Sequence, residues 1–589
     1  MTWQGWATLV IVAVVVGLLA RGARSPALTM LLGVVAVVLL GIVSAPQAFS
    51  GFSNPAPITV AALFIIAGGI EKTGALQPLV AAVFGRTNGE RRSLLRLLSA
   101  VAASSAAMNN TPIVAMLSPQ VAGWAQRQGR SPSRYLMPLS FAAILGGLLT
   151  LIGTSTNVVV SGLLESAGMP ALGMFEMTPV GLPIAVAGLA LLVLATPALL
   201  PDRRGSSASA GAEAREFVVQ MAVERGGRLD GVGVEEGGLR HLQGLFLVGL
   251  ERDGERSAPI APTTKLRGGD LLAFVGVADA IAELQRMRGL TSAEARHFLD
   301  FTDPGNTFFE AVVGGASPLV GRTLKEAGFR DRYQAAVVAI HRAGARVHGK
   351  LGGEPLRLGD TLLLLADPGF RARWRDRADF LLVSRLGGPS PSASRYAPLA
   401  ALIALGVVAV AGLGLAPVLH AALAGAALTI LVGILTTAEA RGAVSLDVLI
   451  VIAAGFGLGA AVQESGLAAV IADTVLAPLG ALGAPWALAG VVLVTLALTE
   501  LITNTAAAIL VFPVALAVAG DVGADPRAFA IAVALAASCS FLSPLGYQTN
   551  TMVYGPGGYR FGDYARLGAP LTILVVITIV GVFSLLGWV

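Results

Sequence analysis

The sequence of 589 residues contains little cysteine and little charge. Its single cysteine, Cys539, excludes a disulfide framework and a cysteine-rich metal site within one chain. Charged residues make up 13% of the chain, whereas soluble proteins carry roughly a quarter, so a protein that is soluble throughout is excluded. The net charge is +5, but the basic residues are not interleaved with stacking aromatics, which argues against nucleic-acid binding. No nucleophile–base pair, phosphate loop or metal cluster is present, so we do not expect an enzyme.

Long apolar runs predict an integral membrane protein that is mainly α-helical, because each crossing of the bilayer needs about 20 apolar residues. Such runs lie at 4–20, 26–44, 55–70, 135–164 and 178–200, and again at 395–411, 418–436, 446–462, 528–558 and 567–588. The run from Leu9 to Ala20 has no basic segment before it, so we expect a spanning helix there rather than a cleaved signal. The shorter piece 74–84 is expected to lie along the membrane interface.

A polar stretch interrupts one apolar region, where Asn109, Asn110 and Thr111 stand together and Pro112 follows. Polar side chains in hydrocarbon are costly unless they are paired or line a wet cavity. Because Pro112 lacks a backbone donor and disfavours helical geometry at Thr111, we expect two half-helices that meet at a polar tip. Residues 92–126 are therefore predicted to form a re-entrant hairpin, whose free backbone groups can bind ions at mid-membrane depth.

The pattern occurs a second time, in a hairpin predicted at 486–520 with Thr503, Asn504 and Thr505 at its tip. Asn110 and Asn504 are 394 positions apart. Two more pairs have nearly the same separation, Gly153–Asn157 with Gly546–Asn550 and Glu71–Gly74 with Gln463–Gly466. We therefore expect a duplicated membrane unit, with about five spanning helices and one re-entrant hairpin in each half.

The basic residues predict an orientation, since short cytoplasmic loops collect Lys and Arg. The segments placed inside carry Arg21, Arg24, Lys72, Arg86, Arg91, Arg92, Arg96, Arg127, Arg130, Arg134, Arg203, Arg204, Arg441, Arg560 and Arg566. The segments placed outside, 45–54, 165–177, 412–417, 463–485 and 521–527, hold only Arg527. The first hairpin then enters from the cytoplasm and the second from outside, so the halves form an inverted repeat.

Between the halves the sequence predicts a soluble α+β insert on the cytoplasmic side, with Gly- and Ser-rich linkers at 204–211 and 387–394. The insert has its own repeat, because Leu266–Val275 matches Leu356–Leu365 at a separation of 90 positions. Its Gly-Asp turns, at Asp270 and Asp360, are expected to be structural, with a ligand role left open. The expected domains are membrane repeat 1 at 1–201, insert domains at 202–292 and 293–386, a linker at 387–394, and membrane repeat 2 at 395–589.

The two tips, Ser105–Thr111 and Thr499–Thr505, each followed by a second polar break, resemble the paired hairpin tips of the divalent anion/sodium symporter family. The insert units resemble the TrkA C-terminal (RCK C-terminal) domain, and some members of that family carry two such domains at this position. The resemblance implies a homodimeric carrier in the inner (plasma) membrane that moves a small divalent anion with sodium ions by elevator-type alternating access. It also implies control by an unknown cytoplasmic ligand of the TrkA C-terminal domains.

The family's sites carry over residue by residue. The resemblance implies one sodium site from Ser105, Asn109, Asn110 and the Gly153 carbonyl, and a second from Thr499, Asn504 and backbone oxygens near Ile502 and Gly546. It places the anion between the tips, bound by Asn110, Thr111, Thr154, Asn504 and Thr505. The chain departs from the family pattern at Asn109 and Thr503, where Ser is usual, and at Ser155-Thr156 and Gln548-Thr549, where prolines are usual. These polar replacements favour a small oxyanion, with sulfate first and a dicarboxylate next.

Other interpretations stay open at this point. Asn110 and Asn504 can hold their hairpins by interhelical hydrogen bonds alone, and Ser105 and Thr499 can bond back to their own helices. The acid Glu500, beside the second tip, suits either a proton or cation role or a local pair. The main alternative function is a proton-coupled anion carrier or cation/proton antiporter of the same superfamily. A channel is disfavoured, because no Thr-Val-Gly-Tyr-Gly filter occurs.

Overall fold

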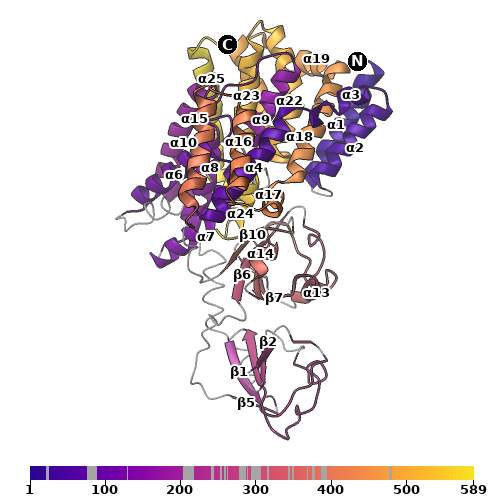
Figure 1. Cartoon of the computed structure of the whole chain (residues 1–589). Coiled ribbons are helices and arrows are strands. Elements are labelled where there is room, and N and C mark those ends of the chain that lie inside the picture. Colours follow the sequence, from indigo (N-terminus) through magenta and orange to yellow (C-terminus); the bar gives the residue numbers. More distant parts are fainter. Residues whose placement is uncertain are drawn as a thin grey trace. The chain divides into compact units, whose positions relative to one another are not determined.

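The computed structural model describes the chain except for residues 22–24, 76–88, 129, 203–217, 240–244, 253–254, 258–259, 262, 277–286, 288, 293–306, 315–316, 343–344, 348–350, 368, 375–378, 386–393, 477–479 and 545. The chain divides into two compact units, both drawn in Figure 1. Residues 1–202, 390–553 and 560–589 form a helical unit. Residues 203–389 and 554–559 form the unit that contains the β-strands.

The helical unit confirms the prediction of a mainly α-helical protein with several apolar helices. Seven helical segments of the described chain are long and apolar enough to cross a membrane. The helices before the insert are α1 (Trp3–Arg21), α2 (Pro26–Leu39), α3 (Ala45–Ala48), η1 (Ser50–Phe52), α4 (Pro55–Thr73), α6 (Glu90–Ala107), α7 (Asn110–Arg127), α8 (Ser133–Gly147), α9 (Ser155–Ser166) and α10 (Thr178–Leu199).

The helices after the insert are α15 (Ala397–Gly412), α16 (Val418–Leu431), α17 (Thr437–Ala443), α18 (Leu446–Glu464), α19 (Leu467–Ile471), a short π-helical turn η3 (Ala472–Leu476), α21 (Ala484–Leu501), α22 (Asn504–Asp521), α23 (Pro526–Ser538), α24 (Gln548–Tyr554) and α25 (Phe561–Leu585). The short helices α3, α17 and α19 lie between the apolar runs and were not expected from hydropathy. The interfacial segment expected at 74–84 falls almost entirely outside the described residues.

The crossings expected at 135–164 and 528–558 are each interrupted by a non-helical segment. In the first, α8 ends at Gly147 and α9 begins after Thr154, whose φ of −143° and ψ of 146° are extended. Gly153 is required there because a Cβ at that position would lie 2.6 Å from the Gly147 carbonyl oxygen. In the second, α23 ends at Ser538 and α24 begins at Gln548. Each broken segment exposes backbone groups that an intact helix would pair.

The effect predicted for Pro112 is wrong in one respect. Thr111 is not displaced from helical geometry, because α7 already begins at Asn110 and Pro112 lies in its first turn. A proline is tolerated there, since the backbone N–H groups of a first turn have no partner within the helix. The break lies before it, at Met108, whose φ of −158° and ψ of 161° are extended.

The two hairpins, α6–α7 and α21–α22, begin at opposite ends of α10. At one end Arg134 contacts Glu90, the first residue of α6, and donates to the Pro197 carbonyl near the end of α10. At the other end Arg527, which follows the second hairpin, pairs with Glu176 just before α10. Since α10 has 22 residues and is therefore about 33 Å long, the hairpin bases are separated by roughly the thickness of a membrane.

The other unit contains two five-stranded sheets with the same strand order. The first is ordered β3-β2-β4-β1-β5 and the second β8-β7-β9-β6-β10, with antiparallel pairing throughout. Their strands are β1 (Val218–Val223), β2 (Leu245–Arg252), β3 (Glu255–Ser257), β4 (Leu271–Gly276), β5 (Leu290–Ser292), β6 (Thr307–Val313), β7 (Ala335–Arg342), β8 (Ala345–Arg346), β9 (Thr361–Ala366) and β10 (Phe380–Arg385). The second sheet is accompanied by the short helices α13 (Phe329–Tyr333), η2 (Leu351–Gly353) and α14 (Phe370–Trp374).

A buried ion pair recurs in both sheets. Arg252 donates to both carboxylate oxygens of Asp270, at 2.8 and 2.7 Å, and Arg342 does the same to Asp360, at 2.9 and 2.8 Å. Both aspartates are almost completely buried, at 2% and 0% exposure. Their carboxylates therefore have a structural use in the Gly-Asp turns, and they fasten strand β2 or β7 to the turn that precedes β4 or β9.

Candidate functional site

Each hairpin tip is an extended link between two helices. In the first hairpin the Oδ1 atom of Asn109 accepts a hydrogen bond from the Thr111 N–H at 3.3 Å, which caps α7. In the second, Ile502 is extended and the Thr503 hydroxyl accepts from the Ala506 N–H, which caps α22. Asn109 and Thr503 thus use their side-chain oxygens to begin the second helix of their hairpins. Asn110 and Asn504 follow as the first residues of those helices.

The first tip brings four oxygen-bearing groups together. Ser105 donates to the Ala143 carbonyl at 2.7 Å and also contacts the Asn110 amide. One terminal atom of that amide faces Ser105 Oγ, the Ala143 carbonyl at 2.9 Å and the Gly153 carbonyl at 3.3 Å. The other terminal atom lies 2.8 Å from the Tyr547 hydroxyl. Ser105 and Asn110 belong to the first hairpin, Ala143 to α8 and Gly153 to the first broken segment. Tyr547 belongs to the second broken segment.

The two orientations of the Asn110 amide have different consequences. With its nitrogen toward Ser105, Ala143 and Gly153, the amide donates to their oxygens and accepts from Tyr547. With its oxygen there, four neutral oxygens converge on one point, which is the kind of donor set that a hard monovalent cation such as sodium takes. The residues around Asn110 can therefore either bind a cation or form hydrogen bonds with the Asn110 amide. Amide oxygen and nitrogen are exchanged by a simple rotation of the side chain.

The second tip repeats this arrangement with other residues. Thr499 donates to Asn504 Oδ1 at 2.9 Å and to the Ala537 carbonyl at 2.6 Å. The amide nitrogen of Asn504 is buried and has no hydrogen-bond partner among the described residues. Gly546 lies close to the backbone of Thr499, because a Cβ at position 546 would be 2.6 Å from the Thr499 carbonyl oxygen. Gly546 is required at this position for the same steric reason as Gly153.

The hydrogen bonds of the two halves have the same sequence separations. Ser105 reaches a carbonyl 38 positions later and an asparagine 5 positions later, and so does Thr499. Asn157 in the first broken segment donates to carbonyls 10 and 7 positions before it, and Asn550 in the second does likewise. Four matched polar contacts in two segments of different sequence indicate that the segments have the same local architecture.

Contacts between the halves connect the first tip and α8 with the second broken segment. Besides the Asn110–Tyr547 hydrogen bond, Ser140 of α8 donates to Thr549 at 2.8 Å and contacts Asn550 Oδ1 at 2.7 Å. Asn110, Ser140, Thr549 and Asn550 are buried, and Tyr547 is half-buried. Helix α22 also packs against α9 of the first half, beside which it is drawn in Figure 1. The site is therefore built from both halves of the chain.

Most of the residues selected from the sequence lie at this region. Ser105, Asn110 and Gly153 meet at the first tip, and Thr499, Asn504 and Gly546 meet at the second. The other selected residues are the caps Asn109 and Thr154, the first-turn residues Thr111 and Thr505, and the tip residue Ile502.

Sequence reasoning missed Tyr547 and the carbonyls of Ala143 and Ala537. Tyr547 occupies the position in the second broken segment that Thr154 occupies in the first, 393 positions earlier. That correspondence could have identified Tyr547 as a site residue. Backbone carbonyls carry no signal in the sequence, so Ala143 and Ala537 could be found only from coordinates.

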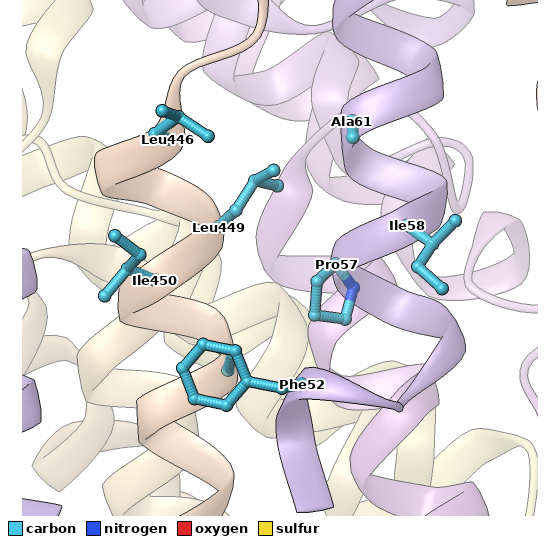
Figure 2. Close-up of a pocket in the computed structure, with 8 residues that line it drawn as sticks. Phe52, Pro57, Ile58, Ala61, Leu446, Leu449 and Ile450 are labelled. Carbon is cyan, nitrogen blue, oxygen red and sulfur yellow. The ribbon is translucent and has the colours of Figure 1, made fainter. Parts of the chain in front are cut away.

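A separate apolar pocket lies between α4 and α18 and is shown in Figure 2. Its volume is about 370 Å³, and its walls include Phe52, Pro57, Leu449 and Ile450. None of its lining side chains carries a hydrogen-bonding group, so it offers nothing to an anion or a cation. The polar tips are the better candidate for the functional site.

A model of the citrate transporter family matches residues 9–534 of this chain. A Chlamydomonas reinhardtii protein whose name refers to the response to sulfur deprivation is 37% identical over 555 residues, which are 92% of this chain and 94% of that protein. The uncharacterized transporter YfbS of Escherichia coli is 32% identical over 96% of this chain and 97% of that protein. Sodium/sulfate cotransporter 1 of Chlamydomonas reinhardtii is 25% identical over 98% of this chain and 89% of that protein.

Proposed function

Since this chain belongs to the citrate transporter family and is therefore a membrane transporter, we propose that it carries a divalent oxyanion together with sodium ions. Sulfate is the first candidate and a dicarboxylate the next. Relatives named sodium/sulfate cotransporters support this choice of ion and anion. The observation that carries the proposal is the matched pair of oxygen-lined tips, joined through the hydrogen bond between Asn110 and Tyr547.

Each tip provides a sodium site in this proposal, and the first is made of neutral oxygens. The first uses Ser105, Asn110 and the carbonyl of Gly153, with the Ala143 carbonyl in reach of the same point. Asn109 is a further ligand only when its oxygen leaves the capping bond to Thr111. Neutral ligands suit a transported ion, since binding must be strong enough to load the carrier and weak enough to release the ion.

The second sodium site uses Thr499, Asn504 and the backbone near Ile502 and Gly546. The Ala537 carbonyl accepts from Thr499 and lies in the same cluster. The side-chain oxygen of Asn504 already faces Thr499 in this cluster, and its buried amide nitrogen has no partner among the described residues. Sodium at both tips would raise the local positive charge before the anion binds.

The anion is held between the tips by helix N-termini and neutral donors. Asn110, Thr111, Asn504 and Thr505 lie in the first turns of α7 and α22, and Thr154 caps α9. The N-terminal ends of helices carry partial positive charge and free N–H groups, which favour anions. No Lys or Arg occurs in either tip, so bound sodium supplies the remaining compensation for a dianion.

Transport proceeds by alternating access of an elevator type in this proposal. The hydrogen bonds from Ser140 to the second broken segment couple the two halves at the site, so the tips and broken segments move as one body. The helices at the start of each half form the scaffold and the contact between the two subunits of a homodimer. The two sheets act as TrkA C-terminal-like regulatory domains in the cytoplasm, and their repeated strand order and Arg–Asp pairs support a duplicated module.

The experiment that tests this proposal is uptake of labelled sulfate by purified protein in liposomes, with and without an inward sodium gradient. We expect sodium-driven uptake of labelled sulfate. Unlabelled sulfate should inhibit this uptake strongly, and succinate or citrate should inhibit it less. Replacing Asn110 or Asn504 by Ala should abolish it, while the exposed amide variant Gln463→Ala serves as the matched control. Full transport by either tip variant would remove the site assignment.

A proton-coupled carrier is the second candidate, and the presence of Glu500 beside the second tip favours it. Under that mechanism a pH gradient would drive uptake and a sodium gradient would not. The same liposomes distinguish the two possibilities when each gradient is imposed alone.

A further inference from the structure

Two of the positions at which the halves of the site differ lie beside the second tip. Glu500 follows Thr499, whereas the first half has Ala106 after Ser105. Ser540 supplies the carbonyl that Asn550 bonds, whereas the first half has Gly147 in that role. The second half therefore carries a carboxylate and a hydroxyl that the first half lacks. The hydrogen bonds of Ser105 and Thr499, and those of Asn157 and Asn550, are matched between the two clusters.

One oxygen of Glu500 has a clear structural use and the other does not. Oε1 accepts hydrogen bonds from the backbone N–H groups of Phe541 and Leu542, at 2.7 and 2.8 Å, which orders the start of the second broken segment. Oε2 is buried and has no hydrogen-bond partner among the described residues. The hydroxyl of Ser540, whose residue is 0% exposed, makes no hydrogen bond of ordinary geometry, and the hydroxyls of Ser540 and Ser543 are neighbours of the Glu500 carboxylate.

The Ser540 hydroxyl lies beside the second cation site, and it is also a neighbour of the Glu500 carboxylate. A Cβ built on Gly546 would be 2.2 Å from Ser540 Oγ, 2.6 Å from the Thr499 carbonyl oxygen and 3.2 Å from the Glu500 Cα atom. Ser540, Thr499 and Glu500 thus converge on Gly546. Thr499 is in turn hydrogen-bonded to Asn504 at 2.9 Å.

The protein provides no described cation for this carboxylate. The ion pairs described in the helical unit are Lys72–Glu439, Arg134–Glu90, Arg527–Glu176 and Arg566–Asp563. A carboxylate at membrane depth is costly without a positive partner, and two backbone N–H groups offset only part of the cost. A transported cation beside Thr499 and Asn504 would supply the missing charge.

We propose that Glu500 and Ser540 make the second cation site anionic, so that the two sodium ions bind to non-equivalent sites. This inference rests on the proposed sodium-coupled function. The first site, with Ala106 and Gly147, is neutral and binds its ion weakly. The second site has one negative charge and an additional oxygen, so it binds its ion more tightly and fills first. Loading is therefore ordered, and the ion at the second tip arrives before the anion.

The test is a sodium titration of purified full-length protein, in which the rise in melting temperature is measured with choline replacing sodium. We expect two components for the wild type. Glu500→Gln keeps an oxygen that can accept from Phe541 and Leu542 but removes the charge. It should weaken the tighter component at least about tenfold and leave the weaker one unchanged.

Three further proteins complete the titration. Ser540→Ala should weaken the same component by a smaller factor, since it removes one neutral oxygen. Asn110→Ala should remove the other component. Glu464→Gln removes a carboxylate from an exposed position at the end of α18 and is the matched control, for which no change is expected.

The outcomes separate this inference from the proposed function. A wild-type protein that sodium does not stabilise would contradict both. A sodium response with two components that Glu500→Gln leaves unchanged would contradict only the inference, because the charge would then have no part in cation binding. If Glu500→Gln does not fold, Ser540→Ala decides the matter, since an unchanged tight component in that variant would also overturn the proposal.

Discussion

The hydroxyl of Tyr547 connects the two halves of the site through its hydrogen bond with Asn110, and its removal gives the sharpest prediction. In Tyr547→Phe the ring keeps its volume, so packing is preserved. The change deletes the 2.8 Å hydrogen bond to Asn110. One terminal atom of the Asn110 amide then has no partner in a buried environment. An unsatisfied buried polar group costs about 1–3 kcal/mol.

That cost falls on the first tip, because the amide must be oriented before it binds an ion or the anion. An energy of about 1–3 kcal/mol corresponds to roughly a 5- to 150-fold loss of affinity. We therefore expect the KM for sulfate in sodium-driven uptake to rise within that range, while the maximal rate changes much less. The melting temperature of the sodium-free protein should fall only slightly.

A second tyrosine provides the control. Tyr135→Phe removes a buried hydroxyl that accepts from Arg130 at 3.1 Å, near the base of the first hairpin rather than at its tip. Its effect on the KM should be negligible. If Tyr547→Phe transports sulfate with the wild-type KM, the joining of the two tips through this hydroxyl has no functional meaning and the reasoning is refuted.

Two further predictions concern folding. Gly153→Ala would place a Cβ 2.6 Å from the Gly147 carbonyl oxygen, so we expect loss of folded protein in size-exclusion chromatography, whereas Gly17→Ala, with nothing within 4 Å, should behave as wild type. The Lys72 ammonium and backbone hydrogen bonds lower the pKa of Glu439 from 4.5 to about 2. This stabilisation is present above pH 4.5 and is lost as the pH falls toward 2, but the exposed pair contributes less than about 1 kcal/mol. Lys72→Met should therefore lower the melting temperature slightly at pH 7, by an amount that shrinks toward pH 3. A difference in melting temperature that grows on acidification would contradict a stabilising Lys72–Glu439 pair.

The tips could be predicted from the sequence because their residues conflict with their surroundings. Asn110 and Asn504 are amides in apolar segments, and such a conflict is resolved only by pairing or by function. The positions of Ser105 and Thr499 followed from the same duplicated pattern. Because burying polar groups in a membrane is costly, this part of the chain could be predicted from its sequence.

The parts that could not be predicted depend on contacts between distant residues. The aromatic ring of Tyr547 suits an apolar run, so nothing in the local pattern marked its hydroxyl as a site group. Pro112 was misjudged, because a proline before a helix and a proline in its first turn have the same local signature. In the insert, the Gly-Asp turns were recognised, but their arginine partners come from strands 18 positions earlier.

The central claim is that the tips of two hairpins, which begin at opposite ends of α10, line one binding site. The most direct test places a single cysteine at Thr111 or at Thr505 in a Cys539→Ala background and measures its reaction with a small thiol reagent in liposomes. Sodium plus sulfate should protect both cysteines over the same concentration range, and neither should be protected by sulfate in choline. Protection of only one of them, or of neither, would contradict a shared site.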